Sequence, residues 1–348
     1  MASALGSGLL ERLEQGPVIC AEGYVWELER RGYLQAGSFV PEVVLERPEV
    51  VRQLHRDLVH AGSDVVEALT YYAHREKLRV IGKEDLLEPI NRDALRVAKE
   101  VAEESGALLA GDISNTNVFV DGDAASAEAV RAMFEEQVGW AADAGVDYVV
   151  AETIAWGKEA LIATEVIKEA GLPAVVTLAI HTDALTFEGW SPAEACKRLE
   201  AAGADVVGLN CIRGPRTMLP LLREIRSAVS CPVAALPVPF RTTEAEPTFA
   251  ILSDPDYDVS GGRCFPTALD PFTCNRYEVA DFAREAYGLG IHYLGLCCGC
   301  GPHHVRSLAE ALGRTPPASR YSPDMSKHAF FGTDEKVKEE YKGYAARL

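Results

Sequence analysis

Positive charge is scarce in this sequence. Its 348 residues include 34 lysines and arginines against 52 aspartates and glutamates, which gives a formal net charge of −18 at pH 7. Such an excess of negative charge repels phosphate backbones and anionic lipid headgroups. We therefore expect no nucleic-acid partner and no binding to an anionic membrane surface.

Long hydrophobic runs are absent as well. No apolar stretch approaches the roughly 20 residues that a membrane-spanning helix needs. The first residues, from Met1 to Arg12, lack the long apolar segment of a secretory signal. These absences predict a cytoplasmic protein.

Cysteine is present, but not in the pattern of a disulfide framework. The chain has 9 cysteines, an odd number, and several lie inside strand-like runs. This pattern is typical of a reducing compartment, with buried or metal-bound thiols. No Gly-x-Gly-x-x-Gly fingerprint follows the first strand-like run, which argues against an NAD-dependent enzyme.

The order of secondary structure predicts an α/β fold. Short strand-like runs alternate with amphipathic helical patterns, and the alternation repeats eight times. The predicted strands are residues 17–24, 64–71, 107–113, 147–152, 174–180, 205–211, 232–237 and 291–296. Parallel strands need helical crossovers, so we expect a (β/α)8 TIM barrel over residues 10–315. A doubly wound open sheet is the alternative, because periodicity does not show whether the sheet closes.

Two segments fall outside this alternation. Residues 240–273 are rich in proline, glycine, threonine and acidic residues, and predict a long functional loop after strand seven. A charged helix is predicted near the end of the chain, from about residue 334 to residue 347. We expect residues 316–348 to form a C-terminal helical arm that packs on a neighbour or over the barrel mouth.

Three cysteines stand at the ends of two predicted strands. Cys211 ends the sixth strand, and Cys297 and Cys298 follow the eighth. In a barrel the carboxyl ends of the strands line the active-site face, and flanking glycines let the backbone turn so that adjacent thiols reach one centre. Three thiolates make a zinc site whose fourth position is open to substrate. We therefore predict Zn2+ as the cofactor.

Other interpretations of these thiols stay open. Cys211 is also explained as an ordinary core cysteine, with Cys297 and Cys298 in a strained vicinal disulfide. Alternatively, Cys297 and Cys300 form a redox C-x-x-C pair.

The same residues carry a family resemblance. Gly208-Leu209-Asn210-Cys211 and Gly295-Leu296-Cys297-Cys298-Gly299 resemble the signature of the zinc-dependent homocysteine S-methyltransferases. Further segments resemble the betaine–homocysteine methyltransferase branch, namely residues 28–33, 53–56, 71–73, 283–287 and 324–327. The similarity spans roughly residues 10 to 330. It implies a (β/α)8 barrel with zinc on the three cysteines, and a homo-oligomer.

The resemblance and the chemistry of such a site imply one reaction. Zinc lowers the pKa of a bound substrate thiol, and the resulting thiolate attacks a methyl group on a quaternary ammonium or sulfonium donor. We predict methyl transfer from glycine betaine or a similar betaine to homocysteine, which gives methionine. The alternatives are another donor (dimethylsulfoniopropionate or S-methylmethionine), another thiol acceptor, or a non-catalytic zinc-binding or thiol-sensing barrel.

The donor site is expected to be an aromatic cage, because ring faces bind an onium cation. The candidates fall where the betaine branch places aromatic donor residues, although core packing explains each one alone: Tyr24, Phe39, Tyr71 and Tyr72. A carboxylated donor also needs a counter-group, for which the candidates are Arg241, Arg263, Ser326 and His328.

The ammonium group of the acceptor calls for a carboxylate. Glu152 ends the fourth predicted strand and matches a family glutamate in this role, where a charged residue is seldom only structural. Glu22, Gly23 and Asn210 are expected to complete the acceptor site.

The chain departs from the family at the first strand. The family ends this strand in Asp-Gly-Gly or Asp-Gly-Ala, whereas this chain has Ala21-Glu22-Gly23, and a family threonine is replaced by Ala68. These changes leave the identity of the acceptor open. Glu67 and Asp112 also lie near strand ends, where a solvated rim position explains them equally well.

Overall fold

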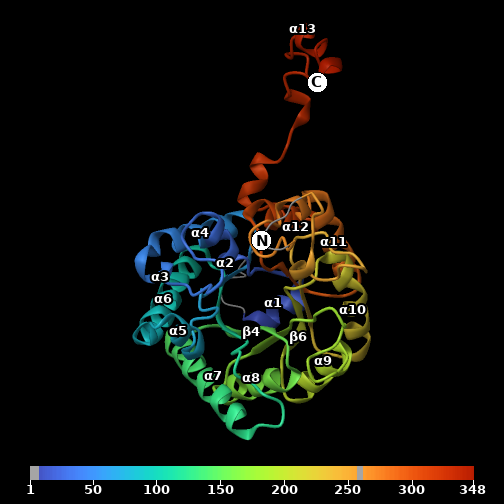
Figure 1. Ribbon diagram of the computed structural model, residues 1–348. Helices are drawn as coiled ribbons and strands as arrows, with labels where there is room; N and C mark the ends of the chain where they lie inside the picture. Colours follow the sequence, from blue (N-terminus) through green and yellow to red (C-terminus); the bar gives the residue numbers. More distant parts are fainter. Residues whose placement is uncertain (1–7, 257–261) are drawn as a thin grey trace.

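Eight parallel strands form one sheet in the order β1-β8-β7-β6-β5-β4-β3-β2. The structure is a computed structural model that describes residues 8–256 and 262–348. The strands are β1 Val18–Ala21, β2 Val65–Glu67, β3 Leu108–Ser114, β4 Tyr148–Ile154, β5 Ala174–Leu178, β6 Val206–Asn210, β7 Val233–Leu236 and β8 Tyr293–Leu296. The N–H of Asp64 donates to the carbonyl of Ile19 at 2.8 Å and so brings β2 back to β1. The sheet is a nearly closed barrel (Figure 1), which confirms the predicted TIM barrel and excludes the open sheet.

Helices cover the outside of the barrel (Figure 1). The long ones are α4 Pro48–Ala61, α6 Leu87–Ser105, α7 Ala124–Ala144, α8 Gly157–Glu169, α9 Pro192–Ala201, α10 Pro215–Ala228, α11 Arg276–Gly288 and α12 Pro302–Ala311. The short ones are α1 Leu9–Gln15, α2 Tyr24–Arg30, α3 Val43–Glu46, α5 Arg75–Ile81 and α13 Glu339–Lys342. Buried residues of α4 recur at Val51, Leu54, His55 and Leu58, the spacing of one helix face, so this face packs inward. Within the described residues, no helix has the length and apolarity to cross a membrane.

Side chains fill the amino-terminal end of the barrel. Leu9 and Leu13 of α1 pack in one buried cluster with Tyr148 and Tyr293 from opposite sides of the barrel. The two phenol groups share a hydrogen bond of 3.0 Å, which satisfies hydroxyls that water does not reach. The cavity of the barrel therefore lies toward the carboxyl ends of the strands.

Two predicted strands run three or more residues past the ends of the observed ones. The first was expected over residues 17–24, but β1 ends at Ala21 and Tyr24 begins α2. The second was expected over residues 64–71, but β2 ends at Glu67. The apolar pattern continues in both places because the residues after the strand ends are buried as well.

A long loop links β7 to α11, as predicted from the composition of residues 240–273. An antiparallel bridge between Phe240 and Thr273 closes its base. Phe249 lies in a short 3-10 turn of this loop and is 4% exposed. The loop is therefore packed onto the mouth of the barrel.

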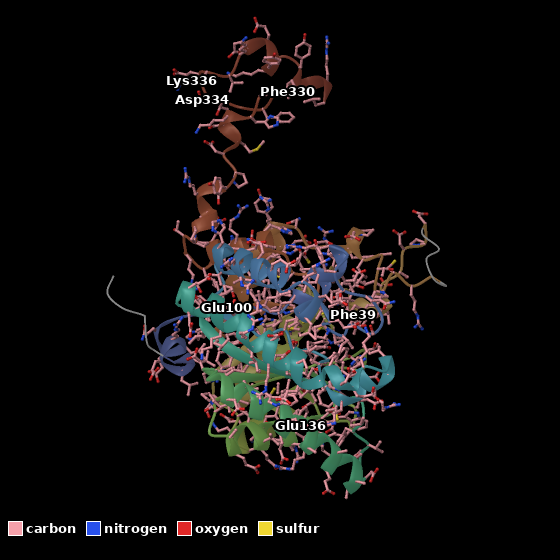
Figure 2. All side chains as sticks on the ribbon, turned by 90° about the vertical axis from the view of Figure 1, so that its left-hand side faces the viewer. Phe39, Glu100, Glu136, Phe330, Asp334 and Lys336 are labelled. Carbon is pink, nitrogen blue, oxygen red and sulfur yellow. The ribbon has the colours of Figure 1, made fainter. Side chains whose placement is uncertain are left out.

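The segment after α12 leaves the barrel. Figure 1 shows the C-terminal end standing apart from the ring of helices, and Figure 2 shows Phe330, Asp334 and Lys336 far from the barrel in a second view. The helix predicted over residues 334–347 is wrong in extent, because only α13 and the 3-10 turn Ala345–Arg347 form. Short helices without packed neighbours are marginal in water. The described arm does not cover the barrel mouth, and its division from the barrel at residue 316 stays a proposal.

Gly295→Ala is expected to destabilise the fold. A Cβ at this position of β8 would lie 1.7 Å from the Cys20 carbonyl oxygen on β1, so neighbouring strands must separate. We expect the free energy of unfolding in urea to fall by about 3 kcal/mol, the upper part of the range for overpacked interiors. The control is Gly139→Ala in α7, where nothing lies within 4 Å of the added methyl group. Alanine should stabilise this helix by about 0.5–1 kcal/mol, and an equal response of both variants would contradict the prediction.

Candidate active site

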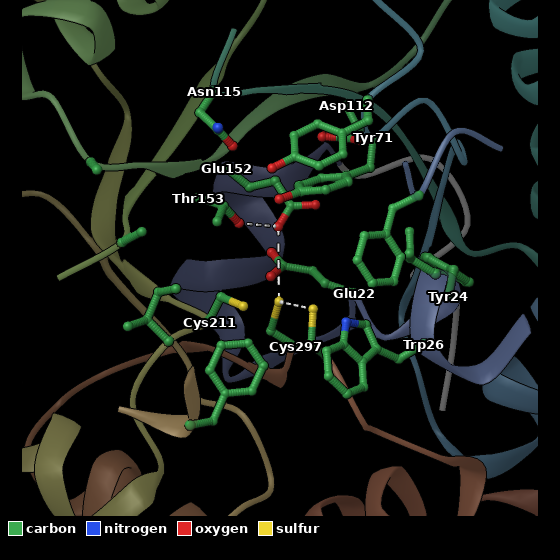
Figure 3. Close-up of a pocket in the computed structure, with 18 of the residues that line it drawn as sticks. Glu22, Tyr24, Trp26, Tyr71, Asp112, Asn115, Glu152, Thr153, Cys211 and Cys297 are labelled. Carbon is green, nitrogen blue, oxygen red and sulfur yellow. Dashed lines mark hydrogen bonds between the residues drawn. The ribbon is translucent and has the colours of Figure 1, made fainter. Parts of the chain in front are cut away.

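A cavity of about 370 Å3 opens at the carboxyl ends of the strands. Carboxylates from the ends of β1 to β4 line one part of it, and thiols that follow β6 and β8 line another. Aromatic rings from α2, from the loop after β2 and from the loop after β7 complete the wall (Figure 3). The cavity thus combines anionic, sulfur and aromatic groups.

The three predicted cysteine ligands converge in this cavity. The sulfur atoms of Cys211, Cys297 and Cys298 all lie within 4.8 Å of one another. The Sγ atoms of Cys297 and Cys298 are 3.8 Å apart. A tetrahedral metal centre with metal–sulfur bonds of about 2.3 Å has sulfur–sulfur edges of about 3.8 Å. The donor set and its spacing therefore fit a metal ion.

Local backbone turns bring the sulfurs together. Cys211 and Ile212 both have a φ of 56°, in the left-handed region that non-glycine residues rarely adopt. Gly299 has a φ of 90°, which turns the chain just after Cys298. Cys297 is buried, whereas Cys298 is half-buried and faces the cavity.

The thiols differ in acidity. Hydrogen bonds from Cys297 and Cys298 lower the pKa of Cys211 well below the usual thiol value. Burial, and then the neighbouring sulfurs, raise the pKa of Cys297 well above it. The other two thiols therefore stabilise a thiolate on Cys211 by hydrogen bonding.

The structure contains free thiols at these positions. Cys297 and Cys298 are both free, and their 3.8 Å separation is far above the about 2.05 Å of a disulfide. Cys300 is also free, and its thiol donates to the carbonyl of Gly301 at 3.7 Å. Neither the vicinal disulfide nor the C-x-x-C disulfide is formed.

Four carboxylates lie side by side at the bottom of the cavity. Glu22 is 5% exposed, Glu67 2%, Asp112 4% and Glu152 3%. The oxygens of Glu67, Asp112 and Glu152 lie within 4.8 Å of one another, and so do ligand atoms of Glu22, Glu152 and Cys297. The solvated rim position considered for Glu67 and Asp112 is wrong, because both point inward and are covered by the cavity wall.

Burial raises the pKa of every carboxyl in this group. It is the first cause for Glu22, Glu67 and Asp112, whose pKa values lie well above the usual range, and repulsion from neighbouring carboxylates adds to it. Burial, followed by the charge on Cys211, raises the pKa of Glu152 to about 8. These carboxyls are therefore stabilised when they bind protons or when a cationic group lies beside them.

Asn210 joins two of the four carboxylates. Its Nδ2 donates to Oε2 of Glu152 at 2.6 Å and to Oε2 of Glu22 at 3.1 Å. The structure thus brings together three of the residues predicted for the acceptor site. Oε1 of Glu22 and Oδ1 of Asp112 have no hydrogen-bond partner within the described part of the chain. Gly23 does not line the cavity. It packs against Cys300, whose Cβ would lie 2.8 Å from a Cβ added at Gly23.

The predicted donor aromatics all line the cavity, namely Tyr24, Phe39, Tyr71 and Tyr72. The Tyr71 and Tyr72 rings are 4.2 Å apart, and the Nζ of Lys77 lies 3.8 Å from the centre of the Tyr72 ring. Lys77 therefore lies against one face of the Tyr72 ring. None of the expected counter-groups lines the cavity, and Arg241 pairs instead with Glu278 at 2.7 Å.

Sequence reasoning missed a second group of rings. Trp26 of α2 lies 6.2 Å from Phe39 between ring centres, 5.6 Å from Phe249 and 5.8 Å from Phe265. Trp26 lines the same cavity as Cys297 and Cys298. The only sequence signal for Trp26 was its position two residues after Tyr24. Phe249 and Phe265 gave no signal, because the long loop after β7 has no periodicity.

Asp112→Asn is expected to stabilise the protein. The folded state raises the pKa of Asp112, so wild type loses stability as the pH rises from the unfolded toward the folded pKa. The amide avoids this loss, and we expect a gain of roughly 1–3 kcal/mol at pH 8 that shrinks toward pH 5. Urea unfolding at both pH values tests it, with the exposed Asp281→Asn as a control that should change little. Lower stability of Asp112→Asn at both pH values would show that the carboxylate has a stabilising partner.

Comparison with known proteins gives a consistent result. A family model described as homocysteine S-methyltransferase matches residues 18–312. The betaine–homocysteine S-methyltransferase 1 of Danio rerio is 38% identical over 336 residues, and that of Xenopus tropicalis 36% over 337, each covering 94% of this chain and 80% of the relative. The S-methylmethionine–homocysteine S-methyltransferase of Rattus norvegicus is 33% identical over 335 residues, covering 93% of this chain and 86% of the relative.

A solved structure has the same fold. The metallated form of the homocysteine methyltransferase MmuM from Escherichia coli matches with a TM-score of 0.67 and 19% identity, covering 86% of this chain and 98% of that one. The family model and the curated relatives decide more than the fold, because they extend over most of the sequence. The chain is an S-methyltransferase that belongs to the homocysteine S-methyltransferase family.

Proposed function

We propose that this protein transfers a methyl group from an onium donor to the thiol of homocysteine at a zinc ion held by Cys211, Cys297 and Cys298. The observation that carries the proposal is the convergence of the three sulfur atoms within 4.8 Å, beside buried carboxylates and aromatic rings. The names of the relatives support homocysteine as the acceptor, and betaine or S-methylmethionine as examples of the donor.

The sulfur atoms fit zinc in kind as well as in spacing. Zinc binds thiolates readily and keeps an open position when only three protein ligands hold it. Bound there, zinc would lower the pKa of the acceptor thiol and provide a thiolate at neutral pH. Asn210 Nδ2 lies 3.8 Å from Cys297 Sγ and favours the ionised form of this sulfur.

The carboxylates orient the acceptor. Glu152 Oε2 is 4.0 Å from Cys297 Sγ, and Asn210 holds Glu152 and Glu22 together. An ammonium group a few ångströms from a thiol therefore reaches this pair of carboxylates while the thiol points at the sulfur ligands. Positive charge from the acceptor also offsets the repulsion within the carboxylate group.

The aromatic wall places the donor. Tyr71, Trp26 and Phe39 present ring faces or edges to the cavity, and an onium cation binds such faces without hydrogen bonds. In the reaction, the acceptor sulfur forms a bond to the methyl carbon, and the carbon–nitrogen or carbon–sulfur bond of the donor breaks. The leaving amine or sulfide keeps the electron pair of that bond and departs neutral. Buried walls exclude water, and proximity supplies much of the acceleration.

Glycine betaine or a similar betaine is the donor that the family branch implies. Homo-oligomerisation through the C-terminal arm and a cytoplasmic location complete the proposal. The arm supports the first, because Tyr321, Phe331 and Tyr341 are exposed on it. Free thiols at all nine cysteines support the second.

The first test is a transfer assay with methyl-deuterated donors, homocysteine and zinc-loaded protein. We expect labelled methionine from the wild-type protein, with about one zinc ion bound per chain. In Cys298→Ala the rate of transfer should fall by more than about 100-fold, and the zinc should be lost. Cys231→Ala, a half-buried thiol outside the cavity, is the matched control and should keep both. Zinc binding without labelled product from any donor would instead support a non-catalytic zinc-binding barrel.

Glu152→Gln is expected to weaken acceptor binding. Loss of the charged partner should raise KM for homocysteine by about 10-fold or more, with a smaller change in kcat. The comparison substrate is 4-mercaptobutyrate, which has the same thiol and no ammonium group. Wild type and variant should use it equally, and an unchanged KM for homocysteine would remove Glu152 from the acceptor site.

A further inference from the structure

The cavity contains more carboxylates than the proposed acceptor needs. Glu22 and Glu152 are joined through Asn210 and lie beside Cys297. Glu67, at the end of β2, and Asp112, on β3, have no bond to Asn210, and their oxygens lie within 4.8 Å of an oxygen of Glu152. These two carboxylates have no role in the mechanism described above.

Neither of the two has a cationic partner. Glu67 Oε2 accepts a weak hydrogen bond from the Cys20 thiol at 3.6 Å. Asp112 Oδ1 has no hydrogen-bond partner among the described residues, although Asp112 is 4% exposed and lines the cavity. A buried carboxylate oxygen without a partner is costly unless a ligand supplies positive charge.

No lysine or arginine of residues 8–256 and 262–348 lines this cavity. The guanidinium of Arg213 is nearby, but it is bonded to the carbonyls of Ile180 and His181. Lys77 lies against the Tyr72 ring without being part of the lining. His181 also lines the cavity, and burial lowers the pKa of its imidazole below the usual value. A carboxylate on a bound donor would therefore meet four carboxylates and no lysine or arginine.

The aromatic rings stand next to the additional carboxylates. Figure 3 shows the Tyr71 ring beside Asp112 and Glu152. Tyr24 belongs to the same wall, and its hydroxyl accepts from the N–H of Glu67 at 3.3 Å. Ring faces and carboxylates together are well suited to a cation that has no hydrogen to donate.

We propose that Glu67 and Asp112 form an anionic donor subsite that selects onium donors without a carboxylate group over betaines. The inference rests on the proposed methyl transfer and replaces the betaine that the family branch implies with quaternary ammonium or sulfonium compounds of net charge +1. Selection comes from attraction to the onium group and from repulsion of any carboxylate that accompanies it.

The test uses donors that differ only in that charge. Glycine betaine and its amide have the same trimethylammonium group, and dimethylsulfoniopropionate and its amide form a second pair. Calorimetric binding to the zinc-loaded full chain is expected to favour each amide by about 10-fold or more. In Glu67→Gln and Asp112→Asn this preference should fall by about 10-fold, because one repelling carboxylate is gone.

Two controls make the comparison specific. Asp281→Asn removes an exposed carboxylate on α11 and should leave the preference unchanged. Lys77→Gln tests whether this lysine binds a donor carboxylate, and it too should leave the preference unchanged. Melting temperatures of Glu67→Gln and Asp112→Asn at or above the wild-type value would show that both variants are folded.

Binding decides the inference, and turnover decides the proposed function. Tighter binding of the acids by wild type, or a preference that persists in both carboxylate variants, would overturn the inference. Loss of betaine binding in Lys77→Gln would overturn it as well, because the donor carboxylate would then have a partner. Absence of labelled methionine with every donor would count against methyl transfer and would leave the binding result to stand by itself.

Discussion

Buried negative charge is the constraint on which this end of the barrel depends. Parallel strands bring their carboxyl ends to one face, and here four of them bring carboxylates into a space that water barely enters. The three cysteine thiols add more potential charge to the same cavity. Charges of one sign repel each other strongly where the dielectric constant is low. Protons on these carboxyls, or the cationic groups of bound molecules, therefore stabilise the site.

The rest of the structure holds this unfavourable group in place. Tyr148 and Tyr293 fill the barrel below it and satisfy each other's hydroxyl groups, so the carboxylates have a rigid floor. Asn210 acts from β6, donating to two carboxylates while its own Oδ1 accepts from the N–H of Thr153 at 2.8 Å. The strained turn at Cys211 costs folding energy that a site without function would not need.

Much of this was visible in the sequence because it is local. Strand and helix periodicity, and a cysteine directly after a strand, depend only on neighbouring residues, so the eightfold alternation and the position of Cys211 could be predicted. Closure of the sheet into a barrel could not be read from periodicity. The burial of Glu67 and Asp112 could not, because it depends on which strands are adjacent and on what covers their ends. Trp26 and Phe249 meet across a loop with no regular pattern, and the final helix was overextended because its charged residues have nothing to pack against.

The placement of the two kinds of group has an evolutionary consequence. The three cysteine sulfurs of the cavity follow β6 and β8, whereas the carboxylates and the tyrosines come from β1 to β4 and the segments that follow them. Mutations in the first half of the gene can therefore change the carboxylates and tyrosines of the cavity without displacing any of the three cysteines. Descendants of this barrel can therefore vary the groups that meet a small molecule while the second half of the gene keeps the three sulfurs together.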